Sequence, residues 1–142
     1  MSQTAIILPA AVQAVLTVAL LLALGPARSR SMRARGQTIT DDDVRLGRNA
    51  WSDEATKLSN SYKSQFEVPV LFYAVVGLAL VAQKADGAML ALAWGFAGSR
   101  IVHAAIHVGP NVVKWRAVVF IVGVAIVLAM GLLLAWRILS GG

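Results

Sequence analysis

Four long apolar stretches, separated by polar and charged segments, dominate the hydropathy pattern of the chain. They cover residues 5–24, 66–82, 89–108 and 117–138. Each has about the 20 residues that an α-helix needs to cross a bilayer. Their continuous apolar character predicts helices, because the strands of a membrane barrel would alternate apolar and polar side chains over about ten residues. The pattern therefore predicts an all-α integral membrane protein, a single four-span domain over 1–142 folded as a four-helix bundle.

The polar segment 25–65, between the first two apolar stretches, contains two signals for the start of a helix. Thr40 precedes three aspartates, and Ser52 precedes Asp53 and Glu54. A capping hydroxyl followed by carboxylates stabilises the first turn of a helix, where the helix dipole favours negative charge. The first signal predicts a short amphipathic helix around residues 44–51, and the second predicts a helix that continues into the second span.

Basic residues are distributed unevenly between the spans. Only Lys84 and Arg137 lie on one side. The basic residues on the other side are Arg28, Arg30, Arg33, Arg35, Arg45, Arg48, Lys57, Lys63, Lys114 and Arg116. Because Lys and Arg accumulate on the cytoplasmic side, we expect the loop 25–65 to be cytoplasmic and both termini to be non-cytoplasmic. The net charge of +6 is then largely this orientation signal. Contact with anionic membrane lipids is expected for the cluster from Arg28 to Arg35, and no nucleic-acid partner is expected.

Ionisable side chains occupy one face of the third apolar stretch. Arg100, His103 and His107 are separated by three and four residues, a spacing that places them on one face of a helix. Ionisable groups at membrane depth pair with one another or face a wet cavity, and they mark a functional site by default. Glu67 near the start of the second span should lie at the depth of Arg100 and form a buried pair that fixes the helix register. Pro69 should kink the second span close to this acid.

More polar residues follow at the same end of the third span, at Asn111, Lys114 and Arg116. A positively charged, partly lipid-shielded pocket with hydrogen-bond donors suits an anionic ligand that carries carboxylates. A metal site is not expected, because no Asp, Glu or Cys accompanies the two histidines on this span and Arg100 would oppose a cation. The chain has no cysteine, which removes thiolate ligands and cysteine nucleophiles.

This set of residues resembles the MAPEG superfamily, the membrane-associated proteins in eicosanoid and glutathione metabolism. The resemblance covers essentially the whole chain and is carried by Glu67, Arg100, His103, His107 and Arg116. Their order and spacing are most similar to the microsomal glutathione transferase and microsomal prostaglandin E synthase branch. The string QFEVPVLFY at 65–73 is similar to the second-span signature of bacterial members. This similarity favours a bacterial inner membrane, with the endoplasmic reticulum as the alternative.

The resemblance implies a homotrimer that holds glutathione between adjacent subunits in the cytoplasmic half of the membrane. It implies that Arg116 is the catalytic residue and stabilises the glutathione thiolate, since a nearby cation lowers the pKa of a thiol. Arg28 and Arg30 would serve the site of the neighbouring subunit. The residues that we expect to bind glutathione are Glu67, Arg100, His103, His107, Lys63, Ser64, Asn111, Arg28 and Arg30.

The chain departs from the family pattern at several of these positions. His107 stands where the family usually has tyrosine, Ser64 where asparagine is common, and Lys63 where arginine is common. Ala117 and Phe120 stand where the eicosanoid enzymes carry hydroxyls, which argues against prostaglandin isomerisation. Two functions stay open. One is a glutathione-dependent transferase or peroxidase acting on lipophilic electrophiles or lipid hydroperoxides. The other is a non-catalytic lipid-binding or scaffold protein that uses the same cavity.

Overall fold

The computed structural model of the chain describes residues 3–35, 40 and 51–140. Its elements are η1 (Gln3–Ile6), α1 (Ile7–Arg35), α3 (Asp53–Lys63), η2 (Ser64–Phe66), α4 (Val68–Val81), α5 (Gly87–Val108) and α6 (Val113–Leu139). Among these described residues, four helical stretches are long and apolar enough to cross a membrane: Thr4–Ala34, Asp53–Val81, Gly87–Val108 and Val113–Leu139. The predicted four-helix membrane bundle is confirmed.

The first two spans extend as helices beyond their apolar stretches. α1 continues through Pro26 to Arg35, because alanine, arginine and methionine in its last turns favour helix. Hydropathy marks where apolar character ends and not where the helix ends. α3 begins after Ser52, whose Oγ accepts a backbone N–H of the first turn at 3.4 Å, as the second start signal predicted. The short helix expected around residues 44–51 lies, except for Trp51, outside the described residues.

A break interrupts the second span between α3 and α4. The short 3₁₀ turn η2 fills this break, and Glu67, which follows it, has φ −88° and ψ −93°, outside the helical region. Pro69 lies in the first turn of α4. Proline has no N–H to donate to the carbonyl of Gln65, and its ring crowds that carbonyl. The predicted kink is therefore present, and the helix is interrupted just before the proline.

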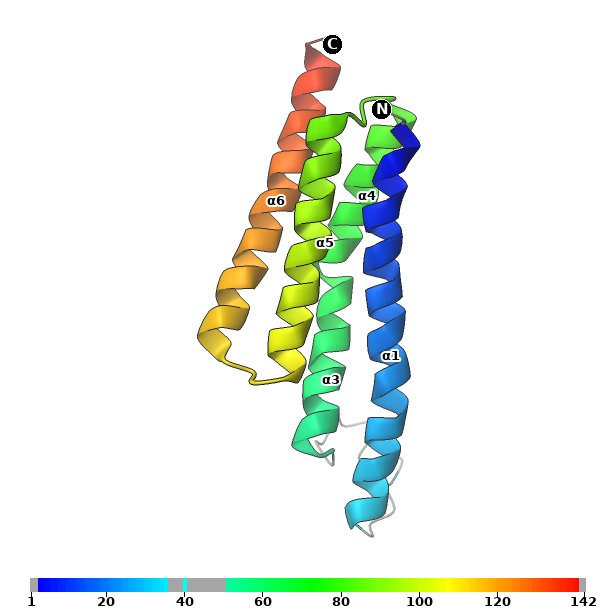
Figure 1. Cartoon of the computed structure of the whole chain (residues 1–142), viewed down its shortest axis with the longest axis vertical. Coiled ribbons are helices and arrows are strands. Elements are labelled where there is room, and N and C mark those ends of the chain that lie inside the picture. Colours follow the sequence, from blue (N-terminus) through cyan, green and yellow to red (C-terminus); the bar gives the residue numbers. More distant parts are fainter. Residues whose placement is uncertain (1–2, 36–39, 41–50, 141–142) are drawn as a thin grey trace.

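The ends of the four spans form two opposite faces of the bundle (Figure 1). Both termini lie at one end, together with the connection between α4 and α5. The other end holds the last turns of α1, the start of α3 and the connection between α5 and α6. α6 packs on α5 and on α4, and it leans away from α3 towards its own N-terminal end.

The centre of the bundle is filled by aromatic and sulfur-containing side chains. Phe72, Phe96, Met89 and Met130 are fully buried, and the two phenylalanine rings stack with centroids 4.4 Å apart. Lipid tails are as apolar as these side chains, so helix association in a membrane depends on close packing. Gly123 supports that packing, because a Cβ there would lie only 3.6 Å from the ring of Phe96 and 3.3 Å from a side-chain oxygen of α5.

An ion pair closes the bundle at the end that carries the termini. Asp86 caps α5 by accepting the N–H of Met89 at 2.9 Å on Oδ1. Its Oδ2 forms an ion pair with Nη2 of Arg137 on α6. Nη1 of Arg137 also donates to the carbonyl of Lys84 at 3.2 Å. The carboxylate thus joins the start of the third span to the end of the fourth.

Asp86 should give the fold a pH-dependent contribution to stability. The N–H of Met89, and then Arg137, hold the pKa of the Asp86 carboxyl below its ordinary value. Since the folded-state pKa is lowered, the contribution is fully present above the ordinary value and is lost as pH falls through the folded-state pKa. We expect Asp86→Asn to lower the melting temperature of the detergent-solubilised protein at neutral pH and to flatten its pH dependence below about pH 4. Equal acid-side slopes in the two proteins would contradict this prediction.

Candidate functional site

Arg100 ties α5 to the break in the second span. Its side chain is fully buried, and Nη2 donates to the carbonyl oxygen of Ser64 at 3.1 Å and to the Oγ of Ser64 at 2.9 Å. The guanidinium carbon lies 5.9 Å from the ring centroid of Phe120. Nε and Nη1 make no hydrogen bond within the described part of the chain. The arginine therefore holds η2 against α5 and keeps unused donors beside the site.

The predicted direct pair between Glu67 and Arg100 is wrong for the single chain. Within residues 51–140 the hydrogen bonds of Arg100 go to Ser64, and Glu67 attracts the guanidinium only through space. The reason is the break: the backbone leaves the helical conformation at Glu67. Its exposed carboxylate then lies beside the side chain of Ser64 on the wall of a cavity.

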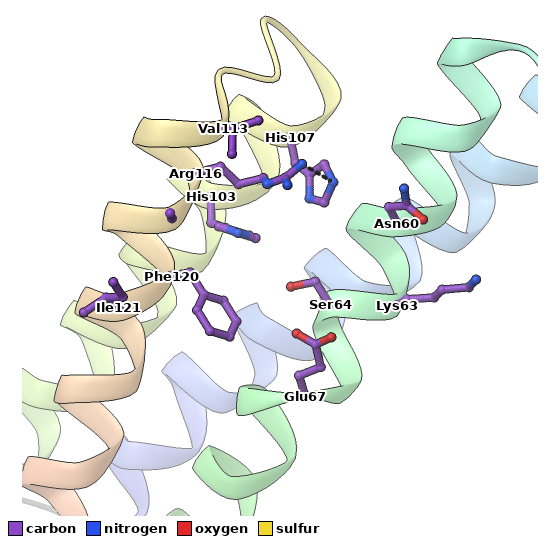
Figure 2. A pocket seen from close by; sticks show the side chains of 11 residues that line it. Asn60, Lys63, Ser64, Glu67, His103, His107, Val113, Arg116, Phe120 and Ile121 are labelled. Carbon is purple, nitrogen blue, oxygen red and sulfur yellow. Dashed lines mark hydrogen bonds between the residues drawn. The ribbon is translucent and has the colours of Figure 1, made fainter.

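This cavity, with a volume of about 560 Å³, lies between the second span, α5 and α6 (Figure 2). Polar side chains come mainly from the second span and α5, and apolar ones come from α6. The lining residues are Asn60, Lys63, Ser64, Glu67, His103, His107, Val113, Arg116, Ala117, Phe120 and Ile121. The volume is in the range of about 300–1,000 Å³ that is typical of small-molecule sites. The cavity therefore has the size and mixed polarity of a site for an amphipathic ligand.

Arg116 extends from α6 to the two histidines of α5 (Figure 2). Its Nη1 lies 3.3 Å from Nε2 of His107 and donates to Oδ1 of Asn111 at 2.9 Å. His103 and His107 are buried and meet edge to face with ring centroids 5.6 Å apart. Asn111, in the connection between α5 and α6, has a φ of 51°, a left-handed conformation that asparagine tolerates well. His103, His107 and Arg116 together form one wall of the cavity, with Asn111 behind it.

The structure brings most of the predicted site residues together. Those that line the cavity are Lys63, Ser64, Glu67, His103, His107 and Arg116. Arg100 and Asn111 lie behind this lining and contact Ser64 and Arg116.

Two predicted site residues lie elsewhere in their own chain. Arg28 on α1 donates to the Oγ of Ser59 at 3.3 Å and lies over the ring of Trp51. Arg30 forms an exposed ion pair with Glu54 at 2.9 Å. Both contacts join α1 to the start of the second span, so neither arginine reaches the cavity of its own chain. Their service to a neighbouring subunit stays a prediction.

Two features of the site region were not found from the sequence. Asn60 lines the cavity, and its spacing of four and seven residues from Ser64 and Glu67 is the helical signal that would have revealed it. Gln13 of α1 donates to the Oε1 of Gln65 in η2 at 2.8 Å, and both side chains are buried. Two amides within or beside apolar stretches were the available signal for this contact.

Comparison with protein-family models gives a match to the MAPEG family over residues 6–136. Comparison with curated proteins found no match. Comparison with solved structures found none either. The matched range begins in η1, ends in α6, covers most or all of each of the four spans and includes every residue that lines the cavity. The chain therefore belongs to the MAPEG family.

Proposed function

We propose that the protein is a membrane-bound, glutathione-dependent transferase or peroxidase that acts on lipophilic electrophiles or lipid hydroperoxides. The observation that carries the proposal is Arg116, a partly exposed guanidinium on the cavity wall, held by neutral side chains. The MAPEG family includes glutathione transferases and peroxidases as well as non-catalytic members. A cation that is not neutralised by an internal carboxylate is what a bound thiolate requires.

The charges around the cavity fit glutathione, which carries two carboxylates, one ammonium group and one thiol. Lys63 and Arg116 supply positive charge, and Glu67 supplies negative charge for the ammonium group. Asn60 and Ser64 supply neutral hydrogen-bonding groups. When bound, glutathione supplies the thiol whose deprotonated form is the nucleophile. The role of Arg116 is to favour the deprotonated form, since a nearby cation lowers the pKa of a thiol.

The wall formed by α6 supports a lipophilic second substrate. Val113, Ala117, Phe120 and Ile121 line the cavity there, and Val113 and Ile121 each expose 64% of their surface. A second substrate dissolved in the bilayer meets this apolar wall without crossing water. Apart from Arg116, these α6 side chains offer no hydrogen-bond donor, so the wall favours hydrophobic partners over polar ones.

We also propose that the site lies on the cytoplasmic side and that the protein is a homotrimer. The end of the bundle that carries the cavity also carries most of the basic residues, which supports the cytoplasmic placement. Because the chain has no cysteine, single cysteines can report on it. A cysteine at the exposed position Ser140 should react with an impermeant maleimide from outside the cell, and one at the exposed position Asp53 should not. Reversed labelling would overturn the orientation, and a molar mass in detergent that differs from three subunits would overturn the trimer.

Titration calorimetry of the detergent-solubilised protein with glutathione tests the proposed function. We expect saturable heat, an ultraviolet thiolate band of the bound ligand, and turnover of a generic aryl halide or an alkyl hydroperoxide. Oxidised glutathione, which has no free thiol, is the control and should give no thiolate band. Binding without a thiolate band and without turnover would favour the non-catalytic lipid-binding or scaffold function. Absence of any binding would overturn the proposal.

A further inference from the structure

The hydrogen bonds of Arg116 are concentrated on one nitrogen. Nη1 carries two N–H groups; one donates to Oδ1 of Asn111 and the other points to Nε2 of His107. A guanidinium stays protonated and has no acceptor, so Nε2 of His107 must be the acceptor. His107 is therefore a neutral imidazole that carries its proton on Nδ1. That Nδ1 group is buried and makes no hydrogen bond among the described residues.

The other nitrogens of Arg116 keep their donors. Nε and Nη2 make no hydrogen bond within the part of the chain that the structure describes. Arg116 lines the cavity and is partly exposed. Nη1 is thus occupied by the protein, while three N–H groups remain for a ligand.

We propose that His107 and Asn111 are positioning residues that fix the guanidinium of Arg116 by accepting both N–H groups of Nη1. The three side chains come from α5, from the connection after it and from α6, so the orientation of the arginine depends on how these elements meet. Both acceptors are uncharged, and the full positive charge of Arg116 is left for the ligand. That the ligand anion is a glutathione thiolate rests on the proposed function.

The benefit of this arrangement is preorganisation. A guanidinium already aimed at the position where negative charge develops does not have to reorient when the thiolate forms. The conformation of Asn111 belongs to the same arrangement, because its φ of 51° suits asparagine and glycine. Asparagine therefore provides at one position both the turn and the acceptor for Arg116.

A ligand-free experiment tests the positioning directly. In protein labelled with ¹⁵N-arginine and kept in detergent, a guanidinium with both N–H groups of Nη1 bound should rotate slowly and show two resolved Nη signals. The signals of Arg116 are identified by their loss in Arg116→Lys. We expect His107→Leu and Asn111→Gly to merge them into one averaged signal. His107→Gln, which restores an acceptor, should keep the two Nη signals resolved. Glycine is chosen at position 111 because it tolerates the positive φ of Asn111.

The second arm measures the consequence for the bound ligand. His107→Leu and Asn111→Gly should each raise the pKa of the thiol of bound glutathione by about one unit. Each should also lower kcat about tenfold and change KM less than about twofold. His107→Gln should recover most of the loss. If His107 and Asn111 acted in folding alone, their variants would give less folded protein without a change in the pKa of the bound thiol.

The possible results separate the two proposals. A single averaged signal for Arg116 in the wild-type protein would overturn the positioning by His107 and Asn111. Merged signals in the variants with unchanged thiol pKa and kcat would overturn it as well. If the wild-type protein binds no glutathione, the proposed function fails, and the positioning of Arg116 stands or falls on the ligand-free arm.

Discussion

Arg116→Ala should lower kcat for conjugation of a generic aryl halide by about 10²–10³-fold, the effect of losing one preorganised donor at a developing negative charge. Arg116 lines the cavity and is only partly buried, so its removal should leave folding and assembly intact. The affinity for glutathione should change less than kcat, because an interaction with the thiolate acts mainly after deprotonation. Steady-state kinetics and a spectrophotometric titration of the bound thiol measure both effects.

Lys114→Ala is the matched control for this variant. Lys114 lies on the same helix and carries the same charge, but it is exposed and does not line the cavity. The Lys114→Ala substitution should leave kcat and the pKa of the bound thiol near their wild-type values. If both variants lose activity equally, the effect is one of general positive charge, and Arg116 has no specific role.

Arg100→Ala should destabilise the protein by about 3–5 kcal/mol, the largest effect on stability that we expect from one substitution. The substitution removes two hydrogen bonds to Ser64 and leaves a void at a fully buried position. Arg100→Met fills most of that void without a charge and should cost less. Thermal melting and SDS titration of the detergent-solubilised variants provide the measurement.

A double-mutant cycle identifies the partner of Arg100. Combined with Arg100→Met, Ser64→Ala should give a coupling energy above about 0.5 kcal/mol, because the two side chains are in contact. Glu67→Gln should give a smaller coupling, since its carboxylate lies on the cavity wall and not on the guanidinium. Stronger coupling to Glu67 than to Ser64 would restore the direct pair that the sequence predicted.

The bundle could be predicted from the sequence because the membrane requires long apolar helices, and the four apolar stretches are unambiguous. The face with Arg100, His103 and His107 was also predictable, because the helical period fixes which side chains share a face. All three are buried, as residues on an inward face must be.

The details that the sequence did not provide depend on local backbone conformation and on helix packing. The direction of Glu67 is set by its ψ of −93°, which no periodicity argument provides. The contact between Arg116 and Asn111 depends on a left-handed residue in the connection between two helices. The positions of Arg28 and Arg30 depend on which face of α1 packs on α3. Hydropathy is similar around a helix with so many apolar residues, so it does not select that face.

Gln13 of the first span and Gln65 of the second are both buried, and their side-chain amides are hydrogen-bonded to each other. If the two spans lay apart in lipid, each amide would lack this partner in apolar surroundings, a state that costs free energy. The bond offsets part of that cost, because Oε1 of Gln13 makes no hydrogen bond within the described residues. The contact therefore favours the association of the first two spans over their separation in the bilayer.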